Sequence, residues 1–111
     1  MRMIVAFVQP FMAPQVMQAL HEVPELTGAT FMDAKGFGRG RLTDAPTSEV
    51  LYGTADKVRV EIVVRDELEE MVVRAILEAA HTGNQGDGKV FVLPVDRAVR
   101  IATDEEGEDV V

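Results

Sequence analysis

Hydrophobic residues recur along the first third of the chain in strand-like and helix-like patterns. Residues 3–8 form a continuous apolar run with β-branched members, which predicts a buried strand. Apolar residues then recur at helical spacing over 12–23, and Pro14 suits the first turn of a helix because its missing N–H is not needed there. We expect 25–28, "ELTG", to end this helix and 29–35 to form a second strand.

The clearest strand pattern lies at 57–64, "KVRVEIVV". Strict alternation places one set of side chains on one face of a sheet and the rest on the other. The first set is Val58, Val60, Ile62 and Val64.

A second helix is predicted after this strand. Asp66 is expected to cap it, with Glu69 three residues later as the reciprocal partner of a capping box. Residues 89–95 are expected to form a fourth strand, and 98–103 a short fifth piece. The expected apolar face of the helix consists of Leu68, Met71, Val72, Ala75, Ile76 and Ala79.

This order, strand–helix–strand twice over, predicts an α+β fold of the ferredoxin-like βαββαβ type. Its sheet would carry helices on one face only. The chain has no further helix to cover the other, valine-rich face, so we expect a symmetric oligomer.

Residues 36–56, between the second and third strands, form an unusually long connection. Loops of this length inside a small domain are usually functional. The segment contains several glycines together with Thr, Ser and one Tyr. We expect a mobile arm.

Composition narrows the class of protein. With 111 residues, 47% of them hydrophobic and none of them Cys, the chain suits one domain over 1–103 without disulfides or thiolate metal sites. No stretch approaches the ~18 apolar residues of a membrane helix, and the N-terminus lacks the features of a signal peptide. We therefore expect a soluble, cytoplasmic protein that does not insert into membranes.

The net charge of −8 argues against nucleic-acid binding, which needs a clustered positive face. Five acidic residues lie between Asp104 and Asp109, so 104–111 is interpreted as a solvated acidic tail, with partner binding as the lesser alternative. His21 and His81 have no partner spacing typical of zinc, so we expect no metal site.

Residues 83–89 spell G-x-x-x-x-G-K, the pattern of a phosphate-binding loop, but Val90 replaces the Ser or Thr that holds Mg²⁺. The loop also lies between a helix and a strand, the reverse of the hydrolase order. The hydrolase interpretation therefore fails. Phosphate binding by the backbone near Gly86 and Gly88, with Lys89 adding a charge, stays open beside a plain glycine-rich connection.

Five segments together form a recognisable pattern: "QPF" after the first strand, "KGFGRGR" at 35–41, "KVRVEIVV" at 57–64, "AAHTGNQGDGKVFVLPV" at 79–95 and "AVRI" at 98–101. In these segments the chain resembles the PII signal-transduction family of nitrogen regulators. The resemblance implies a homotrimer of ferredoxin-like subunits. It also implies a regulator without enzymatic activity, with ATP or ADP (or AMP) bound in clefts between subunits.

The resemblance also implies residue roles. Gly86, Asp87, Gly88 and Lys89 would meet the phosphates, joined by Arg100 from the neighbouring subunit. The residues implied at the base of the long loop are Gly36, Gly38 and Arg39. Those implied on the adenine side are Thr30, Glu61, Ile62 and Val63, although Glu61 is alternatively a solvated surface charge. The loop 36–56, the T-loop of this family, would contact a target protein such as a transporter or an enzyme.

The sequence departs from the family pattern in ways that bear on ligands. Ala102 replaces a second arginine of the last strand, which removes one phosphate contact. Gly40 replaces a glutamine that helps to hold Mg²⁺ and 2-oxoglutarate, which puts both ligands in doubt although Lys57 matches a lysine that pairs with 2-oxoglutarate. Gln9 stands where a lysine is typical. Two other functions stay open: a weak ATP-hydrolysing enzyme and a structural trimer with a non-functional cleft.

Overall fold

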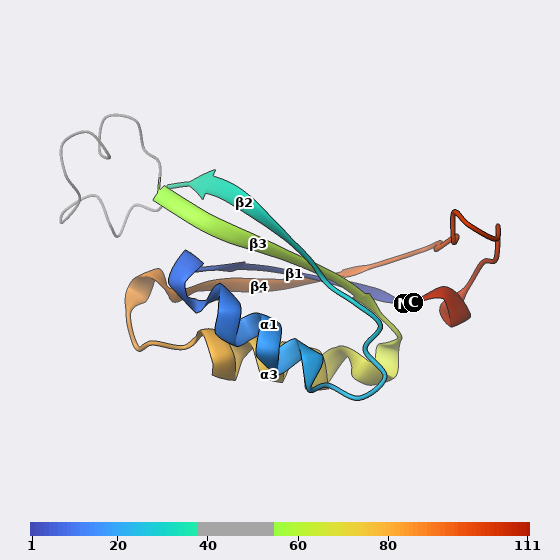
Figure 1. Ribbon diagram of the computed structural model, residues 1–111, viewed down its shortest axis with the longest axis horizontal. Helices are drawn as coiled ribbons and strands as arrows, with labels where there is room; N and C mark the ends of the chain where they lie inside the picture. Colours follow the sequence, from blue (N-terminus) through green and yellow to red (C-terminus); the bar gives the residue numbers. More distant parts are fainter. Residues whose placement is uncertain (38–54) are drawn as a thin grey trace.

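A computed structural model describes residues 1–37 and 55–111 as a four-stranded sheet with two α-helices lying on one of its faces (Figure 1). The elements in chain order are β1 (Arg2–Val8), α1 (Ala13–His21), β2 (Thr30–Gly36), β3 (Ala55–Val64), α3 (Glu69–Ala80) and β4 (Gly88–Pro94). Short 3₁₀ turns lie at Pro10–Met12, Asp66–Leu68, Gln85–Asp87 and Glu108–Val110.

The strands pair in the order β2-β3-β1-β4, and every neighbouring pair is antiparallel. Together with the βαββαβ element order, this is the ferredoxin-like fold that the pattern predicts. Sequence and structure place the boundaries of the four strands within two residues of each other. The first helix ends earlier than predicted, at His21.

The core lies between the sheet and the helices. On β3 the alternation is confirmed, since Val58, Val60, Ile62 and Val64 are all buried. They pack with Ile4, Ala6 and Val8 of β1 and with buried residues of the helices. The helix residues in this core are Val16 and Leu20 of α1 and Val72, Ile76 and Ala80 of α3.

No helix of the described residues lies on the other face of the sheet (Figure 1). The strand registers arrange the side chains of this face in rows that cross the strands. One row runs Lys89, Phe7, Arg59 and Met32. The next runs Phe91, Val5, Glu61 and Thr30, and a third runs Leu93, Met3 and Val63. We call this surface the open face. It mixes apolar residues with a few charges.

The predicted capping box at the start of the second helix is wrong. Asp66 lies inside a 3₁₀ turn, and no side-chain cap precedes α3. The Asp66 carboxylate instead lies 3.0 Å from the amino group of Met1, and Glu69 lies 3.5 Å from the guanidinium of Arg2. The two acids therefore tie the start of β1 to the start of α3, because the sheet brings these charges together.

Two smaller predictions also fail. Met71 is 51% exposed, because the buried stripe of α3 runs through Val72 and Ile76 instead. Residues 98–103 do not form a strand. They belong to a hairpin-like turn closed by the bridge between Val99 and Glu106.

The structure contains, within its described residues, no helix that is both long enough and apolar enough to cross a bilayer.

Candidate functional site

The residues predicted to bind nucleotide phosphates lie at one end of the sheet. The connection 81–87 between α3 and β4 lies there beside the end of β1, while both chain termini lie at the opposite end (Figure 1). Gly36, the last residue of β2, pairs with Ala55 at the same end. Gly38 and Arg39 lie outside the described residues, as does most of the 36–56 arm.

Asp87 organises this connection from within. Its carboxylate accepts hydrogen bonds from the hydroxyl and the amide of Thr82 and from the amide of Gly83. Gln9 Nε2 donates to it at 3.2 Å and so links the loop to β1. These bonds, led by the Thr82 hydroxyl, lower the pKa of Asp87 to about 2. Asp87 therefore shapes the loop, and its charge is turned towards the loop's own donors.

Gly88 is required by sterics. Its φ of +109° is in the region that favours glycine, and an added Cβ would lie 1.7 Å from the carbonyl oxygen of Phe7. No other residue type allows β4 to leave the loop so close to β1. This explains the second glycine of the G-x-x-x-x-G-K pattern: at this position the backbone of Gly88 approaches the backbone of Phe7.

A cleft of about 490 Å³ opens between this loop and the ends of β2 and β3. Lys57 Nζ donates to the carbonyl oxygen of Gly86 at 2.9 Å across the cleft. Lys89 makes no hydrogen bond or ion pair with any described residue, so its ammonium is available to an anion. The cleft is lined by Phe7, Gly36, Phe37, Ala55, Lys57, Gln85, Gly86, Gly88, Lys89 and Phe91.

Three of the four residues predicted on the adenine side project onto the open face: Thr30, Glu61 and Val63. Glu61 is not a free surface charge, because Nε and a terminal nitrogen of Arg59 lie 2.9 and 2.8 Å from one of its oxygens. The Arg59 guanidinium also lies 5.4 Å from the centre of the Phe7 ring. The Ile62 side chain is 2% exposed and belongs to the core, so only its backbone could meet a ligand.

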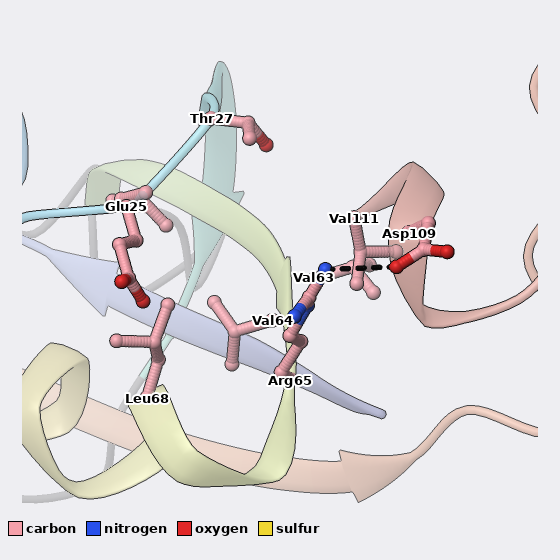
Figure 2. A pocket seen from close by; sticks show the side chains of 9 residues that line it. Glu25, Thr27, Val63, Val64, Arg65, Leu68, Asp109 and Val111 are labelled. Carbon is pink, nitrogen blue, oxygen red and sulfur yellow. Dashed lines mark hydrogen bonds and ion pairs between the residues drawn. The ribbon is translucent and has the colours of Figure 1, made fainter.

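The last residues of β3 have one backbone edge without a strand partner. Pairing with β2 begins at Thr30 opposite Glu61, so Ile62, Val63 and Val64 are paired only with β1. A pocket of about 340 Å³ lies at this edge, beside the connection between α1 and β2 (Figure 2). It is lined by Glu25, Leu26, Thr27, Val63, Val64, Arg65, Leu68, Asp109 and Val111.

Arg100 does not lie near the phosphate loop of its own chain. It follows the far end of β4, in the turn that projects beyond the sheet (Figure 1). Its side chain lies 3.3 Å from Glu105, and Asp104 N–H donates to its carbonyl oxygen at 2.9 Å. Within one chain, the predicted phosphate contacts therefore fall into two groups: residues 86–89 at one end of the sheet and Arg100 beyond the other end.

Sequence reasoning missed the contacts of Arg59 with Glu61 and of Gln9 with Asp87. Arg59 alternates with the buried valines of β3, which placed it on the open face, but the pattern carries no information about its pairing with Glu61. The contact between Gln9 and Asp87 spans 78 residues of sequence. Among the described residues, no cluster of three or more His, Asp or Glu side chains could hold a metal ion.

Comparisons with known proteins cover the whole fold. The family model described as nitrogen regulatory protein P-II matches residues 1–105. A nitrogen regulatory protein P-II of Azospirillum brasilense is 44% identical over 113 aligned residues, which span both chains completely. Proteins of the same description from Rhodospirillum rubrum and Haemophilus influenzae are 42% and 40% identical, also over the full length of both chains.

Proposed function

The chain belongs to the P-II family of nitrogen regulatory proteins, and from this premise we propose that it is a signalling protein that binds an adenine nucleotide. Binding would take place in clefts between the subunits of a homotrimer. The 36–56 arm would pass the bound state on to a target protein such as a transporter or an enzyme. The family acts in signalling, and we propose that this chain likewise has no enzymatic activity of its own.

The observation that carries the proposal is the geometry of residues 81–89, at the end of the sheet where phosphate binding is predicted. Gly88 permits a close backbone approach, and Lys89 faces the cleft without a described partner. Asp87 is the only acid in 81–87. Its carboxylate accepts hydrogen bonds from Thr82, Gly83 and Gln9 and does not line the cleft, so its negative charge opposes a bound polyanion less. The residues therefore fit a di- or triphosphate on a chain that is acidic overall.

The distance between the two groups of predicted phosphate contacts, 86–89 and Arg100, supports a site shared between subunits. Lys57, which contacts the phosphate loop, and Val63, at the Figure 2 pocket, are six residues apart on β3, about 20 Å at the rise of a strand. Arg100 follows Pro94, whose strand partner Arg2 lies opposite Val64, so it belongs to the Val63 end of the sheet. A nucleotide held by Lys89 of one copy could thus reach Arg100 of a second, and the apolar residues of the open face provide a surface for that contact.

Isothermal titration with ATP, ADP and AMP tests the proposal. We expect binding of ATP or ADP without phosphate release, and at least about tenfold weaker binding for Lys89→Ala, since ~1.4 kcal/mol corresponds to a factor of ten. Arg74→Ala is the matched control, because it removes one positive charge from the surface of α3, away from the cleft. We expect it to bind as the parent chain does.

Other outcomes would contradict parts of the proposal. Steady phosphate release would favour the weak ATP-hydrolysing enzyme. Absence of binding at millimolar nucleotide would favour a structural trimer with a non-functional cleft. Titration with 2-oxoglutarate in the presence of Mg²⁺ and ATP tests the ligands that Gly40 puts in doubt, and we propose that neither adds to the heat of binding.

A further inference from the structure

One wall of the pocket in Figure 2 is formed by the C-terminal segment 108–111. Glu108–Val110 forms a 3₁₀ turn, closed by hydrogen bonds from the amides of Val110 and Val111 to the carbonyl oxygens of Gly107 and Glu108. Asp109 and Val111 of this segment line the pocket, opposite Glu25 and Thr27. The segment is a short turn at the pocket rim, and none of its 3₁₀ residues is buried.

Among the described residues, one side chain, Arg65, makes the polar contacts from the domain to this wall. The terminal nitrogen of Arg65 lies 3.1 Å from the Asp109 carboxylate, and Arg65 Nε donates to the carbonyl oxygen of Glu108 at 3.3 Å. These are the described hydrogen bonds and ion pairs that join 108–111 to the body of the domain. Arg65 directly follows β3, so it fixes the wall to the same strand that supplies Val63 and Val64.

The lining of the pocket suits a flat ring better than an anion. Leu26, Val63, Val64 and Leu68 give apolar surface, while Thr27 and the unpaired backbone edge of β3 offer hydrogen-bonding groups. Arg65, the one cation among the described residues that line the pocket, is already engaged by Asp109 and by the Glu108 carbonyl oxygen. Glu25 also lies at the rim. A phosphate would meet a carboxylate there and no available positive charge.

We propose that Arg65 is a positioning residue, which holds 108–111 as the wall against which the base of a bound nucleotide packs. The inference rests on the proposed function and adds residues to it that the sequence did not single out. Release of Arg65 from Asp109 removes the wall from the base end of the site. The phosphate loop at Lys89 keeps its geometry, because it joins β4, which lies two strands away from β3 in the sheet.

The test compares a ligand that has a base with one that lacks it. ATP and inorganic tripolyphosphate are titrated into the full chain and into Arg65→Met and Asp109→Asn. Arg65→Met removes both contacts to 108–111, whereas Asp109→Asn removes only the charge of the ion pair, and both variants keep a similar side-chain size. We expect about fivefold weaker binding of ATP and unchanged binding of tripolyphosphate, as fits an exposed ion pair. Arg65→Asp combined with Asp109→Arg should recover part of the lost ATP affinity.

Hydrogen exchange gives a second measurement that does not depend on tripolyphosphate. Saturation with ATP should slow exchange at the Val110 and Val111 amides of the parent chain, and this protection should be lost in Arg65→Met. Equal losses for both ligands, ATP binding unchanged in both single variants, or no protection of 108–111 in the parent chain would each overturn the inference. If the parent chain binds no nucleotide at all, the proposed function itself fails, a result distinct from these.

Discussion

At the scale of single residues, the phosphate end of the sheet depends on two side-chain choices that act through the backbone. Gly88 leaves room for the Phe7 carbonyl oxygen, and Asp87 gathers the donors of Thr82, Gly83 and Gln9. Neither residue needs to touch a ligand to be essential. Asp87 and Gly88 are therefore explained by folding, whereas Lys89 makes no hydrogen bond or ion pair with a described residue.

Gly88→Ala should destabilise the fold by about 3 kcal/mol, because the new methyl group overlaps the Phe7 carbonyl oxygen and φ is positive. Gly28→Ala is the control, since its Cβ would meet nothing within 4 Å and its φ is unexceptional. Chemical denaturation of both variants measures the difference. Equal stability of the two variants would contradict the steric explanation.

Asp87→Asn should lower the melting temperature at pH 7, and the deficit relative to the parent chain should disappear in acid. The folded pKa of Asp87, about 2, lies below its ordinary value, so its stabilising contribution is fully present above about pH 4. That contribution is lost as the pH falls through about 2. Melting curves from pH 7 to pH 2 measure this, and a deficit as large at pH 2 as at pH 7 would argue against it.

At the scale of elements, the alternation of β3 places its core residues on one face of the sheet and its candidate site residues on the other. Val58, Val60, Ile62 and Val64 are buried against the helices, whereas Arg59, Glu61 and Val63 lie on the open face. The same strand therefore builds the core with one set of side chains and the candidate site with the other. Its last three residues add an unpaired backbone edge.

Substitutions on neighbouring residues of β3 should separate these two roles. Ile62→Ala should cost about 2–5 kcal/mol of stability, while the folded fraction binds nucleotide as before. Val63→Ala should cost much less stability and weaken nucleotide binding severalfold. Denaturation combined with calorimetry on each variant checks this, and a reversed pattern would show that the two faces are misassigned.

Most of this element structure follows from the sequence, because burial on one side of a strand or helix leaves a periodic pattern. The alternation at 57–64 gave both the strand and its buried face. The capping box at Asp66 failed because the charge of Met1, distant in sequence, competes for the same carboxylate. The pairing of Arg59 with Glu61 and of Gln9 with Asp87 likewise depends on strand register and loop closure, which local patterns do not encode.

At the scale of the whole molecule, the open face is the feature that most needs a partner. Phe91 and Leu93 are 48% and 41% exposed on β4, next to Phe7 and Met3 of β1. Such a surface on one side of a sheet is the expected signature of an assembly interface. The proposed trimer would cover it while joining the two separated ends of the site.

Leu93→Asp should disrupt this assembly, because it places an unpaired charge at the β4 end of the apolar row formed with Met3 and Val63. Analytical ultracentrifugation should find the parent chain at three times 12.2 kDa and the variant at 12.2 kDa. Leu77→Asp, on the outer surface of α3, is the control and should leave the mass unchanged. A monomeric parent chain would contradict the proposal.

The unpaired edge of β3 exists because β2 begins only at Thr30, after a connection that contributes Val23 and, in part, Leu26 to the core. Residues 24–29 could therefore be lengthened, shortened or rewritten with little effect on how the domain folds. Each such change would alter the size and polarity of the adjoining pocket. Substitutions in this connection can thus change the chemistry of the pocket while the stability of the fold stays nearly constant.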